Sequence, residues 1–125
     1  MKTHKIYFTI LLVSIATASC SIINYTKNWQ GSDPPGHIYA SFDRFNGKQD
    51  FNARSFSNGH MEVKYTTELT EGELRLEIKC NSKIVLNRDV SCAIHGSLII
   101  DNPGNKPVQF IFKARQAVGK FDLTY

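Results

Sequence analysis

Cys20 is the residue whose surroundings point most directly to a chemical reaction. It follows Ala18 and Ser19, and these three residues match the end of the bacterial lipobox, in which the cysteine thiol receives a diacylglycerol group and cleavage falls just before it. Thr17 departs from that pattern, which usually has leucine or another aliphatic residue at this place. The sequence therefore predicts that Cys20 is lipidated, and the attached acyl chains would hold the protein on a membrane.

The same segment also fits ordinary secretion. Residues 16–18, Ala-Thr-Ala, form an A-x-A site for signal peptidase, and cleavage there would leave Cys20 as an ordinary residue of a secreted protein. Both alternatives use a short positive segment, residues 1–5, followed by an apolar segment, residues 6–16. The apolar segment is too short to cross a bilayer, which takes about 20 apolar residues. We expect residues 1–19 to act as a signal peptide and the chain to be exported in either case.

Two further cysteines, Cys80 and Cys92, remain once Cys20 is assigned to a lipid. An even pair of cysteines outside the cytoplasm can oxidise to a disulfide, and a bridge here would span one turn and one strand. The alternative is two thiols that never meet, because a bridge needs closely spaced Cα atoms. The sequence leaves both alternatives open.

The histidines and carboxylates show no spacing that would build a catalytic or metal site. His37, His60 and His95 lie far apart, without the H-x-H or H-x-x-x-H spacing of metal ligands. Four glutamates resemble the carboxylate pairs of glycoside hydrolases, but they alternate with basic residues on faces expected to be solvated. These glutamates are Glu62, Glu68, Glu73 and Glu77. We therefore expect no catalytic residue, no metal and no cofactor.

Aromatic side chains allow a binding hypothesis. If several of Tyr39, Phe45, Phe51 and Phe56 shared an exposed face, they could stack on sugar rings or on a peptide. The interpretation that we favour is that they fill the core, because large side chains dominate core burial. Trp29 has the same two interpretations, a contact with a ligand or membrane interface and a ring folded back on the domain, and we favour the second.

The charge of the mature chain is small. The formal net charge is +4, but Lys2 and Lys5 leave with the signal, so the 15 basic residues become 13 against 11 acidic ones. These charges are interspersed and form no basic stripe, so a nucleic-acid partner is not expected.

Alternation of apolar and polar residues dominates the chain from residue 38 onward, which is typical of half-buried antiparallel strands. The runs are 38–42, 51–56, 60–69, 73–80, 84–90, 97–101, 108–114 and 121–125. Turn signals separate them, namely Asn46-Gly47, Asn58-Gly59, Glu71-Gly72, Asn81-Ser82-Lys83 and Asn102-Pro103-Gly104. This pattern predicts an all-β fold, a small antiparallel β-sandwich of about seven to eight strands over residues 38–125. Residues 20–37 lack a periodic apolar face, and we expect the anchor cysteine followed by a flexible tether.

Four segments together resemble a known group of proteins. They are Phe42-Asp43-Arg44-Phe45-Asn46-Gly47-Lys48, Val63-Lys64-Tyr65, Glu71-Gly72-Glu73-Leu74-Arg75-Leu76-Glu77-Ile78 and Ala117-Val118-Gly119-Lys120-Phe121-Asp122-Leu123. The chain resembles small secreted or lipid-anchored bacterial β-sandwich proteins of unknown function, over most of residues 38–125. It departs from them at Asn81-Ser82-Lys83, where such proteins usually have Asp-Gly-Lys, and in having Cys80 and Cys92. The resemblance implies a fold and a compartment, and it implies no activity.

These observations predict a non-enzymatic lipoprotein of the cell envelope whose β-sandwich acts as an interaction or structural module. Its expected partners are a membrane, through the lipid anchor, and an envelope protein or glycan. The alternatives are a small secreted hydrolase and a protein inhibitor or immunity-type partner. A hydrolase requires a histidine beside two carboxylates in one cleft, and an inhibitor requires a protruding loop in a tight complex.

Overall fold

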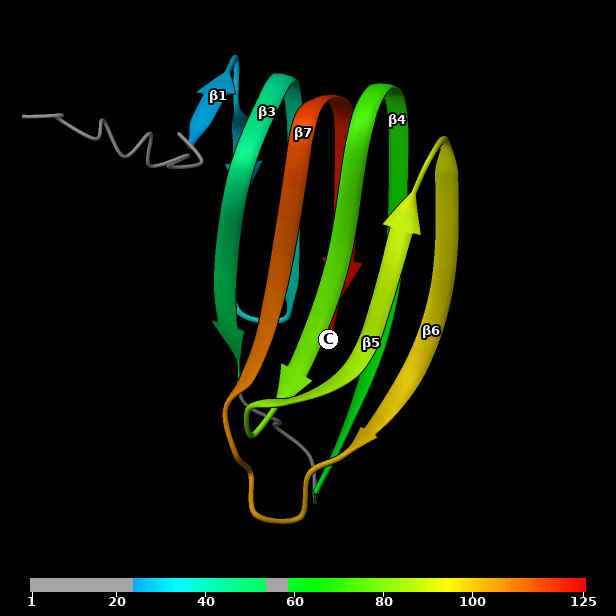
Figure 1. Ribbon diagram of the computed structural model, residues 1–125. Helices are drawn as coiled ribbons and strands as arrows, with labels where there is room; N and C mark the ends of the chain where they lie inside the picture. Colours follow the sequence, from blue (N-terminus) through cyan, green and yellow to red (C-terminus); the bar gives the residue numbers. More distant parts are fainter. Residues whose placement is uncertain (1–23, 54–58) are drawn as a thin grey trace, which may run out of the picture.

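The computed structural model describes residues 24–53 and 59–125, and this part of the chain consists of β-strands joined by turns. Seven strands form one antiparallel sheet (Figure 1). They are β1 (Tyr25–Lys27), β2 (Gln30–Ser32), β3 (His37–Ala53), β4 (His60–Cys80), β5 (Lys83–Val90), β6 (Ala93–Asp101) and β7 (Val108–Thr124). The predicted all-β, sandwich-like fold is confirmed. The predicted signal peptide, Cys20 and Phe56 lie outside the described residues.

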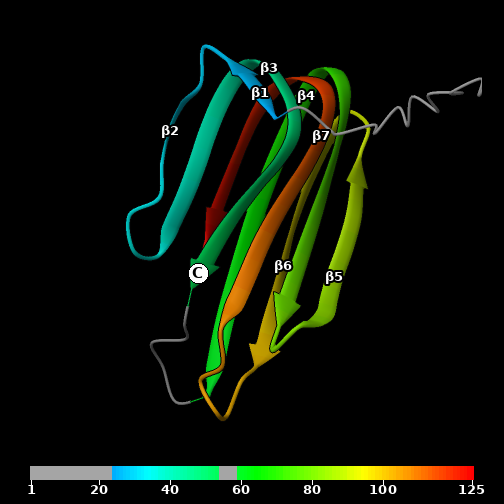
Figure 2. The same cartoon turned by 60° about the vertical axis from the view of Figure 1, so that its left-hand side comes forward.

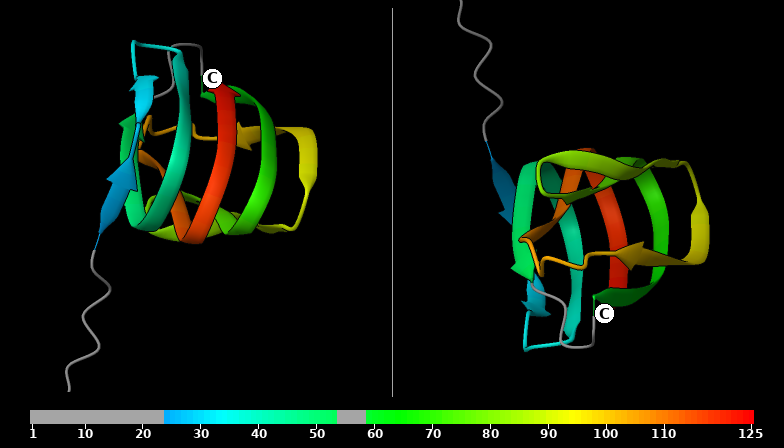
Figure 3. Two further views of the ribbon diagram at one scale, coloured as in Figure 1. Left: turned by 90° about the horizontal axis from the view of Figure 1, so that it is seen from above. Right: turned by 90° about the horizontal axis from the view of Figure 1, so that it is seen from below.

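The sheet is folded over, so that its two halves face each other as layers of a sandwich. β3, β7 and β4 arch at one end of the molecule and run back, and seen from above their arches lie side by side (Figures 1 and 3). Layer A contains β2, residues 37–42 of β3, residues 119–124 of β7, residues 60–69 of β4, and β6. Layer B contains residues 47–53 of β3, 108–115 of β7, 73–80 of β4, and β5, while β1 borders β3 near its bend.

The bends of the long strands contain glycines. In β3 and in β4 the register of pairing with β7 shifts at the bend, as in a β-bulge. Gly47 and Gly72 have φ angles of 111° and 78°, which side-chain-bearing residues rarely adopt. The prediction that Asn46-Gly47 and Glu71-Gly72 are turns between separate strands is therefore wrong. Each pair lies inside one strand that bends and goes on pairing with β7.

The predicted hairpin between β4 and β5 is confirmed. Cys80 pairs with Lys83, and the two residues between them, Asn81 and Ser82, have φ angles of 50° and 63°. Two consecutive positive φ angles are the requirement of the type I′ turn, whose twist matches that of the paired strands.

Residues 25–32, predicted as part of a tether, belong to the domain. β1 and β2 each pair with β3 (Figure 2). Between them the Trp29 ring packs on the core, 5.6 Å from Phe42, 5.5 Å from Phe45 and 5.8 Å from Phe121 between ring centroids. Strands of three residues are too short to show alternation, so the polar composition concealed them. The interpretation of Trp29 as a ring folded back on the domain is confirmed.

The core lies between the two layers and is built from the inward residues of each strand. Its largest fully buried side chains are Phe45, Phe110, Phe112, Ile38, Leu74, Leu76, Ile78 and Leu123. Phe112 of layer B stacks on Phe121 of layer A, with ring centroids 3.8 Å apart and ring planes 10° from parallel. One strand, β7, therefore supplies both rings of a contact that joins the layers.

Candidate functional site

The described histidines lie on the exposed surface of the sheet, and two of the three, His37 and His60, each lie beside an aspartate. His37 Nε2 is 2.9 Å from Asp122 Oδ1, and His60 Nδ1 is 3.1 Å from Asp101 Oδ1. His95 lies on β6 opposite Thr66. Within residues 24–53 and 59–125, no three His, Cys, Asp or Glu side chains gather closely enough to hold a metal ion.

The two described cysteines are free thiols, and the strand register keeps them apart. Cys80 pairs with Lys83 at one end of the β4–β5 hairpin, whereas the carbonyl of Cys92 accepts a hydrogen bond from Leu69 N beyond its other end. The length of β5 separates them, about 3.3 Å per residue, and a disulfide needs Cα atoms within about 7 Å. The structure therefore contradicts the bridge between Cys80 and Cys92. None of the described residues forms a helix that could cross a membrane.

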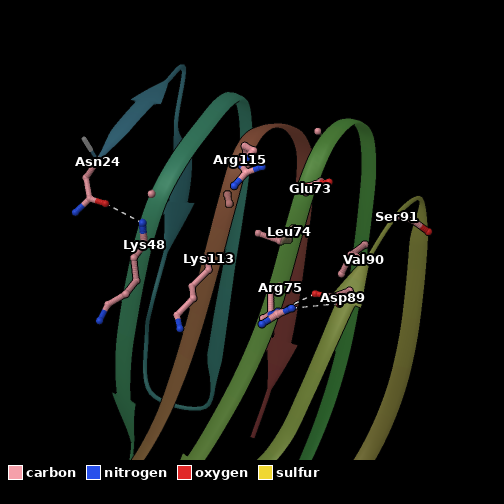
Figure 4. A pocket seen from close by; sticks show the side chains of 13 residues that line it. Asn24, Lys48, Glu73, Leu74, Arg75, Asp89, Val90, Ser91, Lys113 and Arg115 are labelled. Atoms are coloured by element: carbon pink, nitrogen blue, oxygen red, sulfur yellow. Dashed lines mark hydrogen bonds and ion pairs between the residues drawn. The ribbon is translucent and has the colours of Figure 1, made fainter. Parts of the chain in front are cut away.

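The outer face of layer B carries a row of charged side chains from four strands. The register places Lys48 of β3 beside Lys113 of β7, then Arg75 of β4 and Asp89 of β5. Directly opposed residues of antiparallel strands point to the same face, so this row crosses the sheet (Figure 4). A hollow of about 1050 Å³ follows it towards the bends, where Arg115 also lines it. We call this surface the Lys113 face.

Several charged side chains of the Lys113 face form ion pairs with neighbouring side chains. Arg75 donates two hydrogen bonds to the Asp89 carboxylate, at 2.7 Å and 3.4 Å. The hydrogen bond from Arg75 lowers the pKa of Asp89, and the same bond raises the pKa of Arg75. Lys113 Nζ lies 3.0 Å from Glu77 Oε1, and the Glu77 residue is only 5% exposed.

The outer face of layer A is different in composition. Its central row runs from Tyr39 of β3 through Asp122 of β7 and Thr66 of β4 to His95 of β6. Two hollows of about 660 Å³ and 460 Å³ lie on this surface. They share four lining residues, Gln30, Ser41, Glu68 and Lys120, so they form one continuous depression. We call this surface, from Tyr39 to Asn28, the Tyr39 face.

Charges of the Tyr39 face are paired with neighbours on the same face. Asp122 is paired with His37, and Lys120 Nζ lies 3.4 Å from Glu68 Oε2. At the far end of the depression the Asn28 side-chain amide donates a hydrogen bond to the Asp43 carboxylate. The charged groups of this face therefore already hold polar partners, and neutral donors and acceptors lie between them.

Tyr39 is the exposed ring of this face. It is 40% exposed, and the His37 ring packs against it with centroids 4.7 Å apart. Gln30, Ser41 and Thr66 add neutral amide and hydroxyl groups to the depression below it. An aromatic plane beside neutral donors and acceptors can pack on the apolar side of a ligand and hydrogen-bond to its edge.

The predictions for the aromatic residues have different outcomes. Phe45 is fully buried, and Phe51 packs against Phe112 and Phe121, as the core interpretation requires. Tyr39 instead points outward, where the binding hypothesis placed it. The core interpretation is therefore wrong for Tyr39 alone among the described members of this set.

The glutamates lie on β4, two in each layer. Glu62 and Glu68 are exposed on layer A, and Glu73 is exposed on layer B, as predicted. Glu77 was predicted to be solvated and is nearly buried, because the Lys113 side chain lies across it. Since the outer faces of the two layers point in opposite directions, the four carboxylates are not brought together in one cleft.

Sequence reasoning missed much of the Tyr39 face. Gln30 and Ser41 carry no motif, and Asp122 lies 83 residues from Tyr39 in the chain. They meet only because β2 and β7 both pair with the first half of β3. The one available signal was position 39 itself, an aromatic residue at an outward place of an alternating strand.

No protein-family model and no curated protein matches the sequence. Among solved structures, one described as "CBM4 structure and function" is 10% identical over 79% of this chain and 76% of its own, with a TM-score of 0.42. TmCBM61 in complex with β-1,4-galactotriose is 9% identical over 77% and 63%, with a TM-score of 0.39. The Drosophila melanogaster CENP-C cupin domain is 14% identical over 81% and 79%, with a TM-score of 0.33. At these identities and TM-scores nothing is transferred from them to this chain.

Proposed function

We propose that this protein is a non-enzymatic interaction module of the cell envelope, held at a membrane by a lipid on Cys20, and that its Tyr39 face binds a neutral glycan. The lipid and the export signal come from the sequence pattern of residues 1–20. The choice of face and of ligand class rests on the described side chains.

One observation carries the ligand class: an exposed aromatic ring stands on a sheet face whose charged groups already hold hydrogen-bonding partners on the same face. A charged ligand would have to compete with the His37–Asp122 and Lys120–Glu68 pairs for its contacts. A neutral sugar does not, because its C–H face packs on an aromatic plane and its hydroxyls hydrogen-bond to amides, hydroxyls and carboxylates. The continuous depression gives room for more than one sugar ring along the face.

The Lys113 face supports this function less well. Its hollow is larger, but the row that lines it is charged and includes no exposed aromatic ring among the described residues. A neutral sugar would gain no stacking surface there. It would also displace water from charged groups without offering them an opposite charge in return.

Replacing Tyr39 with alanine should weaken glycan binding by about tenfold or more, since burying one large apolar side chain under a ligand contributes about 1.5–3 kcal/mol. The measurement is binding of the full chain to a panel of neutral oligosaccharides and to isolated envelope polysaccharide, followed by titration calorimetry on the best ligand. Tyr25→Ala is the matched control, because Tyr25 is 49% exposed but lies on β1, away from the Tyr39 face.

Equal binding by Tyr39→Ala and the parent protein would refute the Tyr39 face as the site. Binding that survives enzymatic removal of glycans from the envelope material would refute the glycan and indicate a protein partner. Correct folding of each variant is checked by its circular dichroism spectrum.

Substituting Cys20 with alanine should abolish incorporation of labelled palmitate when the chain is expressed in a bacterial host. The reason is that the thiol of Cys20 is the proposed acceptor of the first lipid. Cys92→Ala is the control, because it removes an exposed thiol of the domain and should leave labelling unchanged. Labelling that persists in Cys20→Ala would exclude the anchor, and cleavage after Ala18 would then explain export.

A further inference from the structure

β6 forms one margin of layer A, and among the described strands it pairs with β4 alone (Figure 1). The strand pairs with β4 along its nine residues, from Ala93 opposite Glu68 to Asp101 opposite His60, without a register shift. The opposite side of β6 therefore presents a regular row of backbone N–H and C=O groups that another strand could pair with.

This edge lacks the features by which proteins usually prevent such pairing, which are short length, bulges, proline and lysine. β6 contains no lysine, arginine or proline. Ile99 projects from it at 69% exposure, the largest value among the exposed large apolar residues of the described chain. Ile94 and Leu98 on the inward side pack against the core and remain half-buried.

The other margins of the sandwich are protected. β1 and β2 are three residues long, which leaves little edge to pair with. Residues 47–53 of β3 form a margin of layer B beyond β1, and this stretch contains Lys48. β5 contains Lys83 and Arg88, and its pairing with β4 is interrupted by a register shift. Among the described strands, β6 is thus the one long, regular edge without basic residues.

We propose that β6 pairs antiparallel with β6 of a second copy of this chain, so that layer A continues from one molecule into the other. Self-pairing is favoured by polar complementarity along the strand. When two copies are centred on Leu98, His95 of each lies opposite Asp101 of the other, where an imidazole N–H can donate a hydrogen bond to the carboxylate. Like charges directly opposite each other on two strands destabilise a sheet, and this register avoids them.

The apolar residues fit the same register. Leu98 of one copy meets Leu98 of the other on the inward side, so both half-buried side chains become covered. On the outward side Ile99 of each copy lies opposite Ser97 of the other, which removes apolar surface from water. The two-fold symmetry closes the assembly at two copies, because each molecule has one such edge among its described strands.

This dimer is independent of the proposed ligand, but it would affect how the Tyr39 face is used. Antiparallel pairing within one sheet keeps the outer faces of both A layers on the same side. Two Tyr39 faces would then be presented together, and a polymeric ligand could contact both at once.

Sedimentation velocity of the full chain in detergent should show a dimer at high protein concentration that dissociates on dilution. Ile99→Lys should raise the dissociation constant by about tenfold or more, because it removes the apolar contact across the two edges and puts a lysine on the pairing strand. Ile84→Lys is the matched control, since Ile84 is also an exposed isoleucine, 54% exposed, on the margin formed by β5. It should leave the dimer unchanged.

Charge substitutions test the proposed register of the pairing between the two β6 strands. His95→Glu should weaken the dimer by opposing two carboxylates, and adding Asp101→Lys should restore it. A parent chain that is monomeric at every concentration overturns the proposal. So does a dimer that Ile99→Lys leaves intact, since two chains sharing one micelle would behave in that way. If Ile84→Lys abolished the dimer and Ile99→Lys did not, the interface would lie on β5, and the proposal for β6 would be refuted.

Discussion

Replacement of Phe112 by alanine is expected to lower the free energy of unfolding by about 3–5 kcal/mol. Phe112 is 1% exposed, stacks on Phe121 at 3.8 Å and meets the edge of Phe51 at 6.1 Å between ring centroids. Since Phe121 belongs to the other layer, the substitution leaves a cavity in the contact that joins layers A and B. A domain of this size has a total stability of roughly 5–15 kcal/mol, so the loss is a large part of it.

Urea denaturation followed by circular dichroism measures this effect. The variants are compared using one common slope of unfolding free energy against urea concentration. Phe112→Leu should retain much of the stability, because it keeps most of the apolar volume. Tyr39→Ala is the surface control, and it should change the unfolding free energy by about 1 kcal/mol or less. A loss for Phe112→Ala no larger than that of Tyr39→Ala would mean that the two layers are not held together by this stack.

Gly72→Ala should destabilise the fold by roughly 2–5 kcal/mol, although it adds a single methyl group. The φ angle of Gly72 is 78°, which is unfavourable for alanine. A Cβ atom at this position would also lie 2.2 Å from the carbonyl oxygen of Gln116 and 2.6 Å from that of Arg115. These are backbone atoms of the neighbouring β7, so they cannot turn away as the end of a side chain would.

The control for this prediction is Gly104→Ala in the turn between β6 and β7. There the nearest atom to an added Cβ is the Lys106 Cε at 3.2 Å, which belongs to a flexible side chain. We expect a change of about 0.5 kcal/mol or less. Equal stability of Gly72→Ala and Gly104→Ala, measured by the same urea titration, would show that β4 does not pass so closely over β7 at its bend.

The bends explain why the alternating pattern predicts strand residues correctly but places the strand boundaries wrongly. Asn46-Gly47 and Asn81-Ser82 both interrupt an alternating run, and both include positive φ angles. At Asn81-Ser82 the chain reverses and pairs with itself. At Asn46-Gly47 it bends and continues along the same neighbour, β7. Local sequence gives the same signal in both cases, and the difference lies in which distant strand supplies the hydrogen bonds on either side.

Glu77 and Tyr39 illustrate the same limit for side chains. Both occupy places that alternation assigns to the outer face, and both do point outward from their layers. Glu77 is nearly buried because Lys113, 36 residues later, lies across it. Tyr39 stays exposed on a depression formed with residues of β2, β4 and β7. Alternation fixes the direction of a side chain, whereas its exposure depends on the neighbours that the topology provides.

The sequence by itself determined the β class of this protein, its inward residues and its hairpin at Asn81-Ser82. These follow from short-range rules, because side-chain alternation and turn conformation involve residues close in the chain. Export through residues 1–19 stays a prediction from the composition of that segment. Tertiary structure decided that residues 25–32 join the domain, that Cys80 and Cys92 stay apart, and that one folded sheet supplies both layers. It also assembled the Tyr39 face and left the β6 edge open. Those outcomes depend on pairing between strands that are distant in sequence, and no local pattern encodes which strands will meet.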